Sequence, residues 1–195
     1  MEQRLFKTTT AVLAVITVSG CLNRESAVTN TQPMSSALSP DEQLAVRAVV
    51  AGFADTWNRH DMNAMHALDT DDVEWINVTG NHWRGKAAVY KGHDNIHRTI
   101  FAKTQMNVLD TSTRPIAPGV ALVVATMMFS PVITPLGQLV PDLKSRGTFT
   151  VVRRDGVWKI VHFQNTSVDP DAEKDDPITW DETGFLPGKG VKKPD

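Results

Sequence analysis

Hydrophobic side chains recur with helical spacing behind residue 39. Ser39-Pro40-Asp41-Glu42 forms a capping box with proline at the first helical position. Behind it, apolar residues recur every three to four positions at Val46, Val49, Val50, Phe53, Ala54 and Trp57. This spacing predicts an amphipathic helix that ends near residues 58–60. We expect a second, short helix from Asp61 and a third from about Lys86 to Phe101.

The remaining apolar residues follow the pattern of β-strands. Expected strands span approximately residues 73–78, 105–115, 120–130, 143–154 and 157–167. Pro118-Gly119 and Asp155-Gly156 are turn signals, whereas residues 131–141 hold three prolines and a glycine and predict a loop that interrupts the sheet. The order helix, helix, strand, helix and then four strands predicts an α+β fold, with helices on one side of a mainly antiparallel sheet.

The first twenty residues have the pattern of a secretory signal. Arg4 and Lys7 are followed by an uncharged run over residues 8–18, which is shorter than the ~20 apolar residues that span a bilayer. Val18-Ser19-Gly20-Cys21 then resembles the bacterial lipobox, whose cysteine receives a diacylglycerol. We therefore expect residues 1–20 to be removed and Cys21 to anchor the chain to a membrane; the alternative is a plain signal peptide with a chance cysteine. Because Leu22 and not aspartate follows, the resemblance favours the outer membrane, facing the periplasm, over the inner membrane.

Composition divides the rest of the chain into a tether, one domain and a tail. Residues 21–38 are rich in Ser, Thr and Asn without apolar periodicity, which is typical of a flexible tether. Residues 39–168 hold all the predicted elements and suffice for one domain. From 169 to 195 we expect an irregular polar tail, which Trp180 and Phe185 could pin to the domain.

Charge and motifs exclude several partners and cofactors. The net charge is −2, and it becomes −3 without residues 1–20. The mature part has no cluster of Lys or Arg, so nucleic acid is not an expected partner. The single cysteine excludes an intramolecular disulfide and a cysteine-cluster metal site. Because no Gly-x-Gly-x-x-Gly follows a strand and no phosphate loop or flavin motif is present, we expect no cofactor.

The order of elements and its motifs resemble the nuclear transport factor 2-like superfamily, known as SnoaL-like in bacteria, and within it the SgcJ/EcaC family. The stretches that carry the resemblance are Phe53–Asp61, Asn77–Gly85, His93, Phe149–Ile160 and Phe163–Thr166. The resemblance implies a cone: a curved sheet wrapped around the long first helix, with a pocket at the open end. It also allows a homodimer.

Three segments would converge on that opening. In the last strand His162 and Gln164 alternate with Lys159, and because Lys159 should be solvated we assign His162 and Gln164 to the concave side. The candidate ligand-binding residues are Asn77, His82, Trp83, Tyr90, Gln164 and Asn165, and the candidate catalytic residues are His93 and His162.

Several of these residues have structural alternatives. His93 and His97 stand four apart, a spacing that suits zinc, but no acidic residue completes a His-Glu-x-x-His signature. We therefore expect no metal, a hydrogen-bonding role for His93 inside the pocket, and a position at the rim for His97. Trp83 could simply close the core, and the amides Gln164 and Asn165 could hold loops.

Two classes of function remain. Ketosteroid isomerase, polyketide cyclases and scytalone dehydratase belong to the superfamily and need a general base beside donors that stabilise an enolate. The isomerase has its base aspartate on the strand that here carries Asn77, which cannot take a proton, so a histidine would have to replace it. We therefore favour a protein that binds a small, largely apolar ligand over a cofactor-independent isomerase, cyclase or dehydratase with a histidine base.

Overall fold

The computed structural model describes residues 37–134, 136–174 and 176–179. Cys21, the expected signal and tether up to residue 36, Trp180 and Phe185 lie outside the described residues. Among the helices of the described part, none combines the length and the hydropathy that a bilayer crossing requires.

Three helices form where the pattern predicts them. Helix α1 spans Pro40–Asn58, and its capping box is complete: the Ser39 hydroxyl accepts from the Glu42 amide, and the Glu42 carboxylate accepts from the Ser39 amide. Helix α2 spans Met62–Ala67. Helix α3 spans Lys86–His97 and ends four residues before the predicted end.

The strands of the described residues are β1 Asp69–Ile76, β2 His82–Arg84, β3 Gln105–Ala117, β4 Val120–Ser130, β5 Val132–Ile133, β6 Leu139–Val140, β7 Leu143–Arg154 and β8 Val157–Ser167. Six of them form one sheet in the order β2-β1-β8-β7-β4-β3. Neighbours in this sheet are antiparallel except β1 and β8, which run parallel. The expected loop over 131–141 contains a separate hairpin of β5 and β6.

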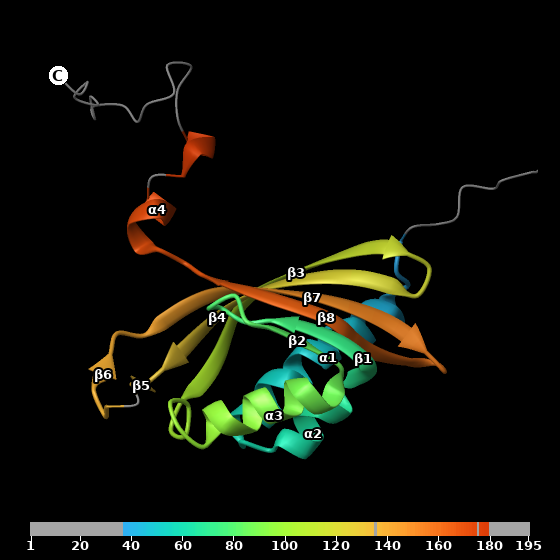
Figure 1. The fold of residues 1–195 in the computed structure, drawn as a ribbon. Helices are drawn as coiled ribbons and strands as arrows, with labels where there is room; N and C mark the ends of the chain where they lie inside the picture. The colour runs from blue at the N-terminus through green and yellow to red at the C-terminus, as the bar shows by residue number, and fades with distance from the viewer. Residues whose placement is uncertain (1–36, 135, 175, 180–195) are drawn as a thin grey trace, which may run out of the picture. The chain divides into compact units, whose positions relative to one another are not determined.

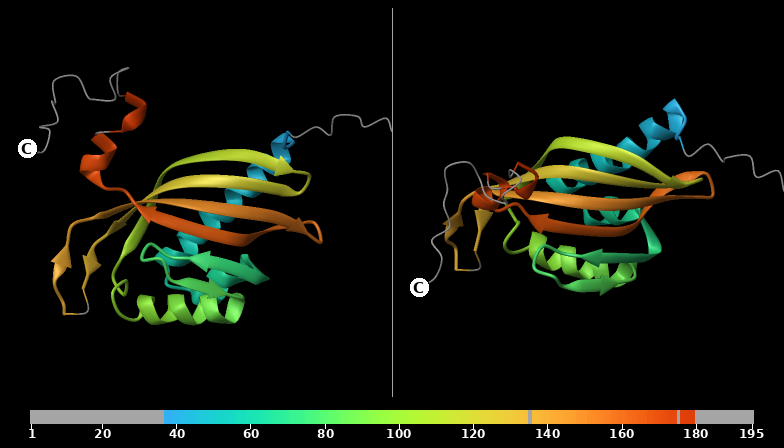
Figure 2. Two further views of the ribbon diagram at one scale, coloured as in Figure 1. Left: turned by 45° about the horizontal axis from the view of Figure 1, so that its top comes forward. Right: turned by 90° about the horizontal axis from the view of Figure 1, so that it is seen from above.

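The sheet is curved, and helices α1, α2 and α3 lie on its concave side (Figures 1 and 2). Helix α1 runs along the inside of the sheet, whereas α3 lies beside β1 and β2 and packs on α2. This arrangement confirms the predicted α+β fold with a curved, mainly antiparallel sheet around the first helix. In the described part of the segment that was expected to be irregular, residues 170–174 form α4 (Pro170–Lys174) and residues 177–179 form a 3₁₀ turn (Pro177–Thr179).

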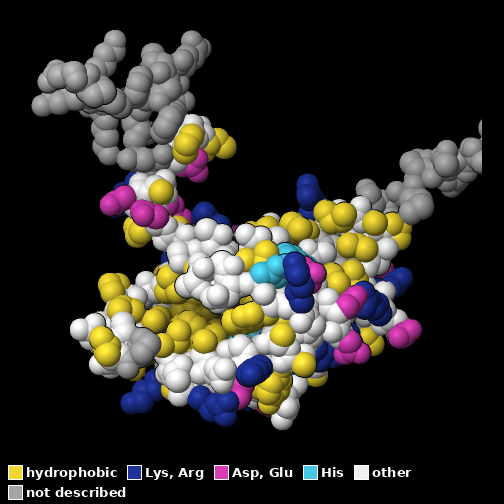
Figure 3. Space-filling model, in the orientation of Figure 1, with side chains coloured by type: hydrophobic (Ala, Val, Ile, Leu, Met, Phe, Trp, Pro, Cys, Tyr) yellow, Lys and Arg dark blue, Asp and Glu magenta, His cyan; other side chains and the backbone are white. Residues whose placement is uncertain are grey.

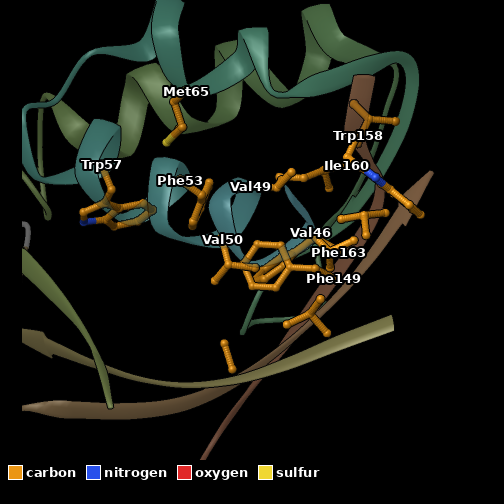
Figure 4. Close-up of a cluster of buried hydrophobic side chains, with 14 of the residues drawn as sticks. Val46, Val49, Val50, Phe53, Trp57, Met65, Phe149, Trp158, Ile160 and Phe163 are labelled. Atoms are coloured by element: carbon orange, nitrogen blue, oxygen red, sulfur yellow. The ribbon is translucent and has the colours of Figure 1, made fainter. Parts of the chain in front are cut away.

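The core lies between α1 and the sheet. Figure 4 shows Val46, Val49 and Phe53 of α1 pointing toward aromatic side chains of the strands. The ring centroid of Phe53 lies 5.5 Å from that of Phe149 in an edge-on contact. Apolar side chains spaced by one helical turn therefore fill the space between α1 and the concave face of the sheet.

A β-bulge in β8 reverses the facing that strict alternation predicts. Opposite the neighbouring strand β7, Ile160 pairs with Val151 but His162 pairs with Thr150, so Val161 is an extra residue. Phe163 therefore points inward, and it is 2% exposed.

Candidate ligand-binding site

A cavity of about 250 Å³ opens between the end of α1, the helix α3 and the concave face of the sheet. Its walls are mainly aromatic and aliphatic. They include Phe53, Trp57, Trp75, Trp83, Ile96, Phe101, Met127, Phe129, Leu143 and Phe163. In Figure 3, hydrophobic side chains gather in a hollow between α3 and the strands, beside the β5–β6 hairpin. The larger hollows elsewhere, of about 490 and 480 Å³, are lined mostly by exposed polar residues, so this apolar cavity is the better candidate site.

Two glycines let aromatic rings form the walls. Gly85 precedes α3 with φ 79°, a conformation that favours glycine, and so ends β2 and starts the helix in one residue. A Cβ atom on Gly92 would lie 2.7 Å from the Trp83 ring, closer than packed atoms come. Gly92 thus lets the Trp83 ring pack directly against the backbone of α3.

His93 projects from α3 into a box of three tryptophan rings. Its ring centroid lies 4.6 Å from that of Trp75, 5.5 Å from that of Trp83 and 6.1 Å from that of Trp57, each close to perpendicular. Its Nδ1 atom is enclosed and has no hydrogen-bond partner among the described residues. Because His93 lines the cavity and its Nδ1 is enclosed, a ligand could meet only another part of the ring.

The surroundings of His93 keep it uncharged. Its side chain is 2% exposed, and burial lowers its pKa well below the ordinary value, with a further lowering by His66 and His97. A neutral imidazole has one donor and one acceptor nitrogen. At neutral pH His93 is therefore uncharged, and it can donate one hydrogen bond and accept another.

A buried histidine–aspartate pair lies directly behind His93. The rings of His66 and His93 stack with centroids 5.0 Å apart, and His66 Nδ1 lies 2.7 Å from Asp69 Oδ2. Burial raises the pKa of Asp69, against the hydrogen bond with His66, which lowers it. The pair was missed in the sequence, although His66 shares a helical face with Met62 and such a polar residue on an apolar face was a usable signal.

His97 is not at the rim as predicted. It is 5% exposed, and its ring centroid lies 4.2 Å from that of Trp57. Its Nδ1 lies 2.8 Å from Nδ1 of His60, so one of these nitrogens donates and the other accepts. Burial lowers the pKa of His97 to about 4, with a further lowering by His60 and His66. Helix α3 thus turns both histidines inward, one to the cavity and one to the end of α1.

Four predicted site residues meet at the cavity: Asn77, Trp83, His93 and Asn165. The Asn77 carboxamide oxygen accepts from the amides of Thr79 and Asn81, so this side chain also shapes the β1–β2 turn. Asn165 donates from Nδ2 to the Ser145 hydroxyl at 3.3 Å.

The other predicted residues lie elsewhere. The bulge leaves Gln164 exposed and His162 half-buried on the outer face, so their assignment to the concave side is wrong. His82 points outward from β2, with Nε2 2.9 Å from a Glu74 carboxylate oxygen. Tyr90 packs on His66 with ring centroids 5.5 Å apart, and it is not among the lining residues of the cavity. The described residues contain no cluster of three or more potential metal ligands.

Comparison with known proteins defines the class. The SnoaL-like domain model matches residues 46–168, so the chain belongs to the SnoaL-like domain family. An uncharacterised protein with a cystatin-like fold from Caulobacter vibrioides is 33% identical, with a TM-score of 0.67, over 71% of this chain and 97% of that one. A search among curated proteins finds no significant match.

Two more distant structures share the fold alone. A ketosteroid isomerase-like protein from Erwinia carotovora atroseptica is 15% identical with a TM-score of 0.59, over 68% of this chain and 100% of that one. A type 2 hexachlorocyclohexane dehydrochlorinase is 13% identical with a TM-score of 0.60, over 66% of this chain and 86% of that one. At such identities the catalytic residues of a neighbour cannot be transferred to this chain.

Proposed function

We propose that this SnoaL-like domain binds a small, largely apolar and uncharged ligand in the cavity beside His93. The observation that carries the proposal is the aromatic box around a neutral histidine. None of the lining residues is Lys, Arg, Asp or Glu, so a charged ligand would lose its hydration without a countercharge. The volume of about 250 Å³ suits a molecule smaller than a typical drug.

Binding of neutral ring compounds tests this proposal. Indole, phenol and 2-naphthol serve as probes, and saturation-transfer NMR with competition between probes reports binding at one site. His93→Gln keeps an amide donor and acceptor, whereas His93→Leu removes both, so only the second should weaken probes that carry a hydroxyl group. His162→Gln, on the outer face, is the matched control and should bind like the wild type. Equal binding by all three variants would contradict the assignment of the site. Mass spectrometry of the denatured protein would identify a molecule that co-purifies.

The second candidate function is a cofactor-independent isomerase, cyclase or dehydratase with His93 as general base. The stacked His66–Asp69 pair favours it, because the pair holds the plane of the His93 ring, and His66 helps to keep that ring in the neutral form that can accept a proton. His162 no longer belongs to this hypothesis because it lies on the outer face. Exchange of the α-protons of 2-tetralone in D₂O, followed by NMR, measures such proton abstraction. An exchange rate above that in buffer, which His93→Gln abolishes, would support an enzyme. An exchange rate equal to that in buffer would leave ligand binding as the remaining function.

We also propose that the chain is a lipoprotein of the cell envelope, anchored at Cys21 and facing the periplasm from the outer membrane. The lipobox-like Val18-Ser19-Gly20-Cys21 and the following Leu22 support this proposal. Intact mass and detergent partitioning of wild type and Cys21→Ser test it, and a variant that keeps both properties of the wild type would refute it. We further propose that the chain belongs to the SgcJ/EcaC family and that it forms a homodimer. Sedimentation velocity measures its oligomeric state.

A further inference from the structure

The β5–β6 hairpin presents uncharged hydrophobic residues to solvent. Leu136 is 87% exposed and Leu139 is 72% exposed. Residues 130–141 contain no charged side chain and no histidine. The turn is closed by its own hydrogen bonds, from the Gly137 amide to the Thr134 carbonyl and from the Thr134 amide to the Gln138 carbonyl, both 2.8 Å. The two leucines therefore do not contribute to the core.

The hairpin rises directly from the mouth of the cavity. Phe129 at the end of β4 and Leu143 at the start of β7 both line the cavity, and the hairpin connects them. Figures 1 and 2 show it projecting beyond the end of the main sheet. Any surface that receives the exposed leucines therefore lies next to the ligand site.

We propose that this hairpin inserts into the surface of a phospholipid bilayer and brings the cavity next to the lipids. A bilayer accepts aliphatic side chains without matching shape or hydrogen bonds, which fits two isolated leucines on an uncharged tip. Lys103 is exposed in the loop before β3, and the adjacent Thr104 hydroxyl donates to the Pro131 carbonyl at the base of the hairpin. Lys103 would meet lipid phosphates in this place, whereas the exposed Asp142, just after β6, would stay in water. The insertion is shallow, because the edges of a two-stranded hairpin need water or headgroups as hydrogen-bond partners.

The choice of a membrane as partner rests on the proposed anchor at Cys21. Sixteen residues, 21–36, separate Cys21 from the described domain. The start of α1 and the hairpin lie at opposite ends of the domain (Figures 1 and 2). Fully extended, a segment of this length reaches roughly 55 Å at ~3.3–3.6 Å per residue, which permits the domain to lie on its side on the lipid surface with both ends near the lipids. The ligand of the cavity would then enter from the bilayer, which suits its apolar walls.

The single cysteine makes a direct test simple. The mature chain, residues 21–195, with Cys21→Ser has no thiol, so Gln138→Cys provides one labelling site for the polarity-sensitive dye NBD next to the leucines. An N-terminal histidine tag holds the protein on vesicles of phosphatidylethanolamine, phosphatidylglycerol and a nickel-chelating lipid. This tether replaces the anchor whether or not Cys21 is lipidated in the cell. The experiment therefore tests insertion of the hairpin separately from lipidation of Cys21.

On these vesicles NBD at position 138 should brighten and shift its emission to the blue, whereas NBD at Ser112, exposed on β3, should not. Without the tag, Leu136→Ser should lower partitioning into the vesicles at least about tenfold, and Leu136→Ser with Leu139→Ser further. Leu44→Ser removes a leucine that is 71% exposed on α1 and should leave partitioning unchanged. An unshifted NBD spectrum at position 138 overturns the proposal. A blue shift that grows with protein concentration without vesicles also overturns it, because the hairpin then contacts a second copy of the chain.

Discussion

Lowering the pH from 7 to 5 should destabilise the domain through two buried histidines. Burial holds the pKa of His93 well below its ordinary value and lowers the pKa of His97 to about 4. Unfolding returns both side chains to water, where a histidine titrates near 6.5. Below pH 6.5 the unfolded chain therefore binds protons that the folded domain does not. The stability contributed by the neutral histidines is fully present above pH 6.5 and is lost as the pH falls toward the folded-state values.

The magnitude follows from the width of this window. Each histidine changes the free energy of unfolding by about 1.4 kcal/mol per pH unit once the unfolded form is protonated. From pH 7 to 5 this amounts to roughly 2 kcal/mol for each histidine and roughly 4 kcal/mol for both, against a typical total of ~5–15 kcal/mol. Unfolded Asp and Glu titrate near 4, so carboxylates whose pKa the fold lowers act mainly below this window. The raised pKa of Asp69 acts in the opposite direction, because protonation then favours the folded state.

Urea unfolding, followed by tryptophan fluorescence at pH 7, 6 and 5, measures the effect. His97→Gln should reduce the loss of stability between pH 7 and 5 by about half, and His93→Gln with His97→Gln should remove most of it. The change with pH is independent of any loss that these substitutions cause at pH 7. Since Asp69 is present in all variants, its contribution cancels in the comparison.

His162→Gln is the control, because His162 lies half-buried on the outer face. It should lose as much stability as the wild type. If the double variant also loses as much as the wild type, the buried histidines do not set the pH dependence, and the reasoning from burial is wrong.

Three further predictions concern packing and the frame of the cavity. Trp158 is 6% exposed, so Trp158→Ala should cost ~3–5 kcal/mol in urea unfolding, and a cost below ~1 kcal/mol would contradict its place in the core. Gly92→Ala should destabilise the domain and weaken probe binding, because the Cβ of alanine would displace the Trp83 ring. This effect opposes the ~1 kcal/mol by which alanine favours a helix over glycine, and unchanged binding of indole would contradict the prediction. Asn58→Ala should cost ~1–3 kcal/mol in the same assay, because Asn58 bonds both the amide and the carbonyl of Met106 at 2.7 and 2.9 Å. Asn58→Asp should not restore this loss, because its second carboxylate oxygen would face the Met106 carbonyl oxygen where Asn58 has a donor.

The local elements could be predicted from the sequence because their signals are local. The capping box around Ser39 and the apolar spacing behind it place α1 to within a residue of its observed start. Asp155-Gly156 places the turn between β7 and β8, where both residues have positive φ. Strand β1 begins four residues before its predicted start, because Asp69 pairs with Ile160 although its own type disfavours strands.

The facing of β8 could not be predicted beyond Ile160. Alternation assumes a regular strand, and the sequence around Val161 contains no glycine or proline that would indicate a bulge. One extra residue moves every later side chain to the opposite face. This is why the cavity received Phe163 and Asn165 in place of His162 and Gln164.

By itself, the sequence determined the α+β order and the inward face of α1, because helix caps, turns and periodicity act over a few residues. The expectation that Asn77 and His93 share one pocket came from the family resemblance. Only the tertiary structure decided what surrounds His93. The tryptophans of its box come from α1, β1 and β2, and the stacked His66 comes from α2. Residues so far apart in the chain meet only because the curved sheet and α1 share one core, which fixes where α3 can pack. The burial of His93, and therefore its neutral state, results from that packing. The residues next to His93 in the sequence do not indicate it.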